Sequence, residues 1–128
     1  MDIQRLNPES LPKPAASYCQ ITRRGSIITT AGFVSIDKDG NLVGENDIRI
    51  QTRQTIENLK LALEAVDASI SDVMQTIVYI SDMANYKGMN EIYNEYFVEH
   101  PPTRATVKAE LVLPTMLVEI QAIAVLDE

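Results

Sequence analysis

Two charged residues near the C-terminus lie in strand-like segments among apolar residues, where they could belong to a pocket. Arg104 opens the strand-like run "RATVKAEL", and Glu119 lies inside the apolar run "LVEIQAIA". Charged residues rarely lie among apolar ones without a partner or a function. A planar guanidinium can hold a carboxylate through two parallel hydrogen bonds, and a carboxylate among apolar side chains can accept a proton. The alternative is that both residues lie on a solvated sheet face or form a structural ion pair.

The alternation of side chains along the two predicted strands leaves the relation between these charges open. In the last strand, one face carries Val118, Ile120, Ala122 and Ala124, and the other carries Leu117, Glu119, Gln121 and Ile123. In the preceding strand, Arg104, Thr106, Lys108 and Glu110 lie opposite Ala105, Val107, Ala109 and Leu111. Each strand therefore has a mixed face with one candidate charge, and alternation alone does not show whether the two mixed faces meet.

The elements that position these residues follow from changes in the apolar period. Apolar residues recur every three or four positions at Ile56, Leu59, Leu63 and Val66, and again at Met89, Ile92, Tyr93, Tyr96 and Phe97, which predicts two helices. The predicted elements are a hairpin within 18–32, a turn at 37–41, a helix over about 47–66, a strand over 73–82, a second helix ending before His100, and strands over about 104–111 and 117–126. Asn46 or Asp47 can cap the first helix. The segment 7–17 is predicted to be an extended lead-in.

This order, ββ-α-β-α-ββ, predicts an α+β fold in which two helices pack on one face of a mixed β-sheet. A chain of 128 residues without a linker or repeat is expected to form a single domain over 1–128. The other face of the sheet also contains apolar positions, so we expect further subunits to cover it.

Composition and charge restrict the classes of function. The formal net charge of −7 and the lack of a basic stripe argue against nucleic acid as a partner. One cysteine and one histidine make a metal site an unfavoured interpretation, and no phosphate-binding glycine loop or dinucleotide motif occurs. The absence of a signal-peptide pattern and of a membrane-length apolar run predicts no membrane association and a cytoplasmic location.

Several motifs together resemble those of the RidA family (YjgF/YER057c/UK114). The segment "PTRATVKAELVLPTMLVEIQAIA" is similar to the C-terminal signature of that family, in which an arginine opens a strand, a Leu-Pro turn follows, and a glutamate lies between apolar residues. "SYCQ", "IITTAG" and "NEIYNEYF" are similar to its N-terminal motif, next strand and second helix. The resemblance extends over nearly the whole chain.

The resemblance implies a chorismate-mutase-like fold and a homotrimeric barrel with clefts between subunits. It also implies hydrolysis of reactive 2-enamino or 2-imino acids, such as 2-aminoacrylate, to 2-oxo acids and ammonia without a cofactor. This is the activity of a 2-iminobutanoate/2-iminopropanoate deaminase. Arg104 matches the arginine that binds the substrate carboxylate, and Glu119 matches the glutamate that directs the attacking water. Tyr18 matches a tyrosine lining the cleft, Gly32 and Thr106 match positions whose backbone faces the ligand, and Asn90 matches a polar helix residue near it.

Two departures from the family pattern affect the expected substrate preference. Ala16-Ser17 precedes Tyr18 where many members have Gly-Pro, and Thr106 replaces a cysteine found in many members.

Two other functions stay open at this point. One is an endoribonuclease or translation inhibitor, against which the net charge argues. The other is a non-catalytic trimer that binds small carboxylates or acts as a chaperone, for which Glu119 would not be needed.

Overall fold

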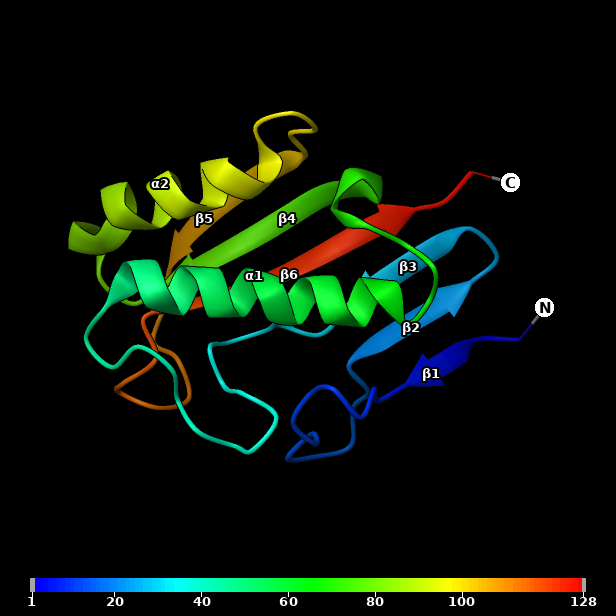
Figure 1. Cartoon of the computed structure of the whole chain (residues 1–128), viewed down its shortest axis with the longest axis horizontal. Helices are drawn as coiled ribbons and strands as arrows, with labels where there is room; N and C mark the ends of the chain where they lie inside the picture. The colour runs from blue at the N-terminus through cyan, green and yellow to red at the C-terminus, as the bar shows by residue number, and fades with distance from the viewer. Residues whose placement is uncertain (1, 128) are drawn as a thin grey trace.

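The computed structural model describes residues 2–127, which form a sheet covered by two helices (Figure 1). The helices are α1 (Ile48–Glu64) and α2 (Tyr86–Phe97), and two 3₁₀ turns are η1 (Ile70–Asp72) and η2 (Met83–Asn85). The strands are β1 (Gln4–Leu6), β2 (Ile21–Arg24), β3 (Ile27–Thr30), β4 (Val73–Ile80), β5 (Thr103–Lys108) and β6 (Val118–Val125). The predicted hairpin, both helices and the last three strands are confirmed, with boundaries that differ by a few residues.

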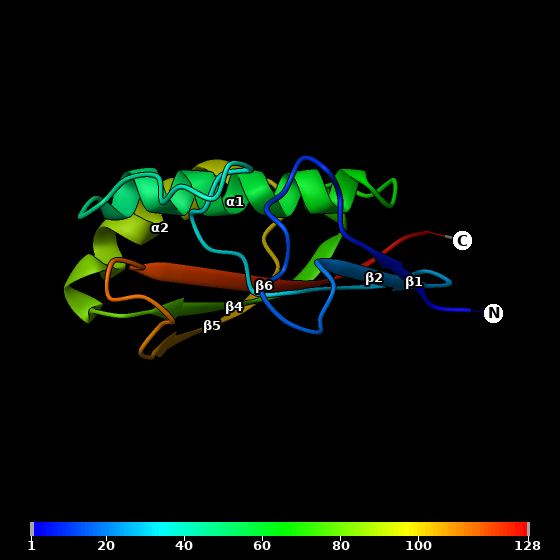
Figure 2. The same ribbon diagram turned by 90° about the horizontal axis from the view of Figure 1, so that it is seen from below.

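The strands form one mixed sheet in the order β1-β2-β3-β6-β4-β5. All neighbours are antiparallel except β4 and β5, which are parallel and are connected through α2. Both helices lie on the same side of the sheet, and no helix or strand of residues 2–127 covers the other side (Figure 2). The predicted α+β fold is therefore confirmed. We call the uncovered side the open face.

Local sequence explains where α1 begins. Asp47 is the N-cap, and its carboxylate accepts hydrogen bonds from the backbone amides of Arg49 at 3.0 Å and Ile50 at 3.1 Å. These amides have no partner within the helix, so the cap stabilises the first turn. Of the two predicted caps, Asp47 is the one that the structure uses.

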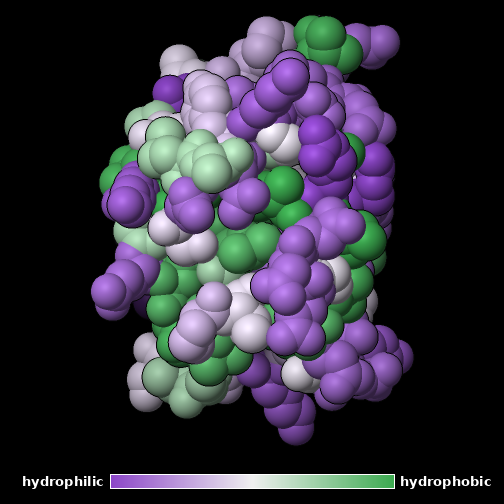
Figure 3. All heavy atoms as spheres, turned by 90° about the vertical axis from the view of Figure 1, so that its left-hand side faces the viewer, coloured by the Kyte–Doolittle hydropathy of each residue, from purple (hydrophilic) through white to green (hydrophobic). Residues whose placement is uncertain are grey.

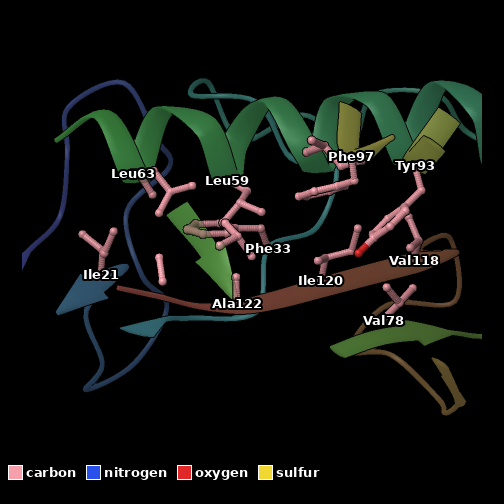
Figure 4. Packing of buried hydrophobic residues seen from close by; sticks show 14 of the residues in the cluster. Ile21, Phe33, Leu59, Leu63, Val78, Tyr93, Phe97, Val118, Ile120 and Ala122 are labelled. Atoms are coloured by element: carbon pink, nitrogen blue, oxygen red, sulfur yellow. The ribbon is translucent and has the colours of Figure 1, made fainter. Parts of the chain in front are cut away.

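The core lies between the helices and the sheet (Figure 4). From β6 it contains Val118, Ile120, Ala122 and Ala124, each at most 4% exposed, as the alternation predicted. Phe33, Leu59 and Phe97 fill the space between this strand and the helices. The alternate residues of β6, including Glu119, consequently face the open side.

Strand β1 was not predicted. Its residues, Gln4–Leu6, include two exposed side chains and show no apolar alternation. The strand exists because these residues pair with Ile21, Thr22 and Arg23 of β2 at the edge of the sheet. Pairing between segments so far apart in sequence leaves no local signal in a polar strand of three residues.

The open face carries several apolar side chains that are half-buried or exposed. Val107 is 43% exposed, Ile27 is 55% exposed and Ile123 is 38% exposed. Tyr79 and Gln121 lie beside each other on this face and share a hydrogen bond of 2.8 Å. Within residues 2–127, no helix is both long and apolar enough to span a bilayer.

Replacing Leu59 by alanine is expected to lower the free energy of unfolding by about 2–5 kcal/mol. Leu59 is completely buried in α1, so the substitution removes apolar contacts and leaves a cavity in the core. Urea denaturation of both proteins would measure the change. Glu64→Ala, at an exposed position of the same helix, should change the value by less than about 0.5 kcal/mol. Equal effects of the two substitutions would contradict the assigned core.

Candidate functional site

Arg104 lies on the helix side of the edge strand β5. Arg104 pairs with Thr76 of β4, and Thr76 in turn pairs with Ala122 of β6 on its other side. Paired residues point to the same face, and Thr76 is buried beneath α2 with its hydroxyl 2.7 Å from that of Tyr93. The side chain of Arg104 is thus directed toward α2.

Two tyrosines of α2 hold the guanidinium of Arg104. Its Nη2 donates to the hydroxyl of Tyr86 at 3.1 Å, and its Cζ lies 4.7 Å from the centre of the Tyr93 ring. The pKa of Tyr86 is lowered by its contact with the Asn90 side chain and by the positive charge of Arg104. No carboxylate within residues 2–127 forms an ion pair with Arg104. The guanidinium is therefore oriented but keeps donors for an external anion.

Two buried polar oxygens accompany Arg104 without hydrogen-bond partners among the described residues. They are Oδ1 of Asn90 and Oγ1 of Thr106. Asn90 is one turn after Tyr86 in α2, and Thr106 is two residues after Arg104 on the same face of β5. Unsatisfied buried groups are uncommon and often mark functional positions. We call Arg104, Tyr86, Tyr93, Asn90 and Thr106 the Arg104 cluster.

The backbone of Thr106 lies at the free edge of the sheet. The amide of Ala109, just after β5, donates to the carbonyl of Ile80 in β4 at 3.1 Å. Hydrogen-bonding direction alternates along a strand, so the amide of Thr106 points away from β4. Among the strands of residues 2–127, β5 has no other neighbour in the sheet. This amide takes no part in the pairing with β4, and the contact with a ligand that the resemblance implied stays a prediction.

Glu119 lies on the open face of β6, in close contact with Gly32. A Cβ atom on Gly32 would lie 2.8 Å from Cδ of Glu119 and closer still to its Oε2. Only glycine allows the carboxylate to approach the backbone in this way. Reciprocal hydrogen bonds of 2.8 and 2.9 Å between Phe33 and Ile120 fix the two segments beside each other.

Burial raises the pKa of Glu119 above the ordinary value for glutamate. The carboxylate is half-buried, and desolvation disfavours its charged form. A raised pKa gives a carboxylate more basicity, which suits it to accept a proton from water.

Tyr18 completes this second group on the loop before β2. The tyrosine ring lines a cavity together with Gly32 and Glu119, and the side chain is 52% exposed. The loop is held by Gln20, a buried residue whose amide side chain donates to the carbonyl of Pro12 at 2.8 Å. Cys19 lines the same cavity and is partly buried. We call Tyr18, Gly32 and Glu119 the Glu119 cluster.

The two clusters lie on opposite faces of the sheet. Arg104 is in register with Thr76, whereas Glu119 is in register with Tyr79, three residues farther along the same strand β4. Residues separated by three positions in a regular strand point to opposite faces. The predicted site residues are thus brought together in two groups, and the single chain does not join them. Within residues 2–127, no group of three or more His, Cys, Asp or Glu side chains is arranged to hold a metal ion.

Known proteins match almost the whole of this chain. The family model described as endoribonuclease L-PSP matches residues 8–126. The chain belongs to this family. The resemblance to the RidA (YjgF) family inferred from the sequence motifs is thereby confirmed.

The relatives of this RidA-family chain are of similar length. A RutC family protein of Pyrococcus horikoshii is 40% identical over 116 residues, covering 91% of this chain and 92% of the relative. The 3-aminoacrylate deaminase RutC of Acinetobacter baylyi is 34% identical, covering 91% and 93%. The crystal structure of E. coli TdcF with bound serine superposes with a TM-score of 0.88 at 28% identity, covering 97% of this chain and 99% of TdcF.

Sequence reasoning missed Tyr86 and the contact of Tyr93 with Arg104 in this RidA-family chain. The sequence pattern places Tyr93 in the apolar stripe of the second helix and gives no signal at Tyr86. The local sequence does not indicate that Tyr93 and Arg104 touch, because this contact depends on how α2 packs on β5. The polar residue Asn90 beside them was the available clue, because it interrupts the apolar face of the helix.

The substitution Gly32→Ala is expected to displace the carboxylate of Glu119 toward solvent and return its pKa toward the ordinary value. The added methyl group would occupy the space now filled by the carboxyl group. Carbon-13 NMR titration of labelled glutamate in both proteins would measure the shift. The carboxyl signal of Glu119 is identified by its absence from the spectrum of the Glu119→Gln variant. An unchanged titration of Glu119 in the variant would contradict the close packing described.

Proposed function

We propose that this RidA-family chain forms a homotrimer and hydrolyses 2-imino or 2-enamino acids to 2-oxo acids and ammonia in clefts between subunits. The observation that carries the proposal is the separation of the two clusters onto opposite faces of one sheet. A carboxylate anchor and a general base can act on one small molecule only if they lie within a few ångströms of it. A second copy whose Arg104 cluster faces the Glu119 cluster of the first would satisfy this requirement.

The features of the open face support such an assembly. Apolar side chains on this face would be covered by another subunit, as burial of apolar surface favours association. The assembly would place Arg104 at the rim of a cleft, with its unpaired donors directed toward the neighbouring Glu119. Serine bound in TdcF and the deaminase name of the Acinetobacter relative also favour a small amino-acid-like ligand.

The reaction can be written with groups of this chain. The substrate carboxylate binds the guanidinium of Arg104, aided by the backbone amide of Thr106. Glu119 accepts a proton from water as the water oxygen attacks the C=N carbon. The C=N π electrons move to the nitrogen, which takes up a proton from solvent to give a carbinolamine. Glu119 then returns its proton to this nitrogen, and ammonia leaves as the C–N bond breaks, the hydroxyl releases its proton to solvent and the C=O bond forms. An enamine first gains a proton at its β-carbon and loses one from nitrogen, which gives the imine. Imines already hydrolyse in water, so orientation and one general base suffice.

A trapping assay would test the proposed activity. An amino-acid oxidase generates 2-imino acids in the presence of semicarbazide, which captures them. Added protein should lower semicarbazone formation, and ammonia should be released faster. If no imine is hydrolysed while 2-oxo acids bind and depend on Arg104, the chain is a carboxylate-binding module. Cleavage of RNA that is lost in Arg104→Ala would instead favour the endoribonuclease function for which the family model is named.

The activity is expected to fall at acidic pH. Because burial raises the pKa of Glu119, its protonated form, which cannot accept a proton, persists to higher pH than for an ordinary glutamate. The ratio of catalysed to uncatalysed hydrolysis should therefore have its highest value above the raised pKa of Glu119. It should decrease as the pH falls through that pKa. The Glu119→Gln variant should lack this decrease. A constant ratio in the wild-type protein down to the ordinary glutamate range would contradict the role of Glu119.

A further inference from the structure

A second cavity, of about 430 Å³, adjoins the Glu119 cluster. Its walls are largely apolar and include Ala16, Phe33, Val34, Ile36, Val112 and Met116. The cavity described with the site has about 560 Å³ and is lined by Cys19, Thr22, Thr29 and Thr30. Both share Tyr18, Gly32 and Glu119. We call them the apolar cavity and the polar cavity.

The two cavities extend from Glu119 in different directions. Thr29 of the polar cavity pairs with Ile123, so this cavity opens on the open face, where a partner's Arg104 cluster would lie. The apolar cavity runs instead toward α1, because Asn58 of that helix is among its lining residues. The buried amide of Asn58 donates to the carbonyls of Val34 and Ile36, each at 2.9 Å. These bonds hold one wall of the apolar cavity in place.

A 2-imino acid has three substituents on its reacting carbon: the carboxylate, the nitrogen and the side chain. The carboxylate is drawn toward Arg104 of the neighbouring subunit, on the open face. With the carbon at Glu119, the apolar cavity is the adjoining space on the other side. We infer that the apolar cavity binds the side chain of the substrate, so that this protein prefers 2-imino acids with aliphatic or thioether side chains over the smallest ones. The inference rests on the proposed function.

The size and rim of the apolar cavity support this preference. The methyl side chain of the alanine imine would leave most of the 430 Å³ unfilled. Each further methylene group removed from water improves binding by about fourfold.

Val112 is 85% exposed in the loop between β5 and β6, the largest value among the exposed large apolar side chains of the described residues. This loop lies at the end of the molecule where exposed apolar and polar side chains are intermixed (Figure 3). A bound apolar side chain would give Val112 a contact that it lacks here.

The test compares imines of increasing side-chain length. Semicarbazide trapping is run with imines generated from alanine, 2-aminobutyrate, norvaline, leucine and methionine, each corrected for its uncatalysed hydrolysis. The kcat/KM is expected to rise with length and to be at least about tenfold higher for the leucine or methionine imine than for the alanine imine. A flat series, or one that falls with length, in a protein that hydrolyses the alanine imine would overturn the inference and leave the proposed function intact.

Matched variants assign the effect to the apolar cavity. Val112→Asp places a charge at its rim and is expected to lower kcat/KM for the leucine imine about tenfold, with the alanine imine changed by less than about twofold. Val98→Asp is the control, since Val98 is 72% exposed and lies outside the cavity. Ala16→Phe, which fills the cavity from an exposed loop, should have the same selective effect as Val112→Asp. Loss of activity toward all imines alike in both cavity variants would overturn the inference.

A binding measurement separates this inference from the proposed reaction. Titration calorimetry with pyruvate and 4-methyl-2-oxopentanoate, the corresponding 2-oxo acids, requires no turnover. Tighter binding of the longer acid, reduced in Val112→Asp, would support the side-chain site even if no imine were hydrolysed. Equal binding of the two acids would overturn the inference, whatever the outcome of the hydrolysis assay.

Discussion

Replacing Arg104 by alanine is expected to lower kcat/KM for 2-imino acid hydrolysis by about 100- to 1,000-fold. The guanidinium stacks on Tyr93 and donates to Tyr86 at 3.1 Å, so it is already oriented for a planar anion. In the proposed reaction, losing it removes the charge that neutralises the substrate carboxylate. Arg104→Lys keeps a charge but loses the two-pronged geometry, and we expect an intermediate loss of about tenfold or more. The measurement is the semicarbazide assay at several substrate concentrations.

A second arginine on the helix layer supplies the control. Arg53 lies on α1 and forms an exposed ion pair with Glu95 at 3.0 Å. Arg53→Ala removes the same type of side chain as Arg104→Ala and changes the net charge by the same amount. It should change kcat/KM by less than about twofold. Circular dichroism should show that both variants are folded. Full activity of folded Arg104→Ala would refute the assignment of the carboxylate anchor.

Replacing Glu119 by glutamine is expected to lower kcat by about 100- to 10,000-fold while changing KM little. Glutamine has nearly the same shape, so the packing against Gly32 is retained and only the ability to accept a proton is lost. Glu110→Gln, at an exposed position in the loop after β5, is the matched control and should retain activity. A rise in KM with unchanged kcat would mean that Glu119 binds substrate rather than activates water.

Mixing the two inactive variants tests whether the site is shared between subunits. When Arg104→Ala and Glu119→Gln chains are unfolded together and refolded in equal amounts, half of the arginine sides and half of the glutamate sides are intact. About a quarter of shared sites would then contain both groups, and activity should return to about a quarter of the wild-type value. Each variant refolded alone is the control. No recovery in a proven mixed oligomer would show that both groups act within one chain.

The local elements could be predicted because their signals are local. The apolar period set both helices, the β-branched run set β4, and Asp47 lay at a position where a carboxylate can cap α1. The alternation along β6 placed Glu119 opposite Ile120, as the structure shows. These features depend on residues within a few positions of one another, where helix and strand geometry fix the direction of every side chain. Spaced motifs of the whole chain also indicated the family.

The elements, the face of its own strand on which each charge lies, and the family could all be inferred from the amino-acid sequence. The position of Arg104 and Glu119 on opposite faces of the sheet could not, because it depends on how the strands pair. Alternation has a period of two, and a shift of one residue in pairing exchanges the faces, so the relation between strands depends on their register. That register is fixed by the pairing of β4 with both β5 and β6. The contact of Tyr86 with Arg104 and the approach of Gly32 to Glu119 likewise join segments distant in sequence, and the packing of the helices and loops on the sheet creates them.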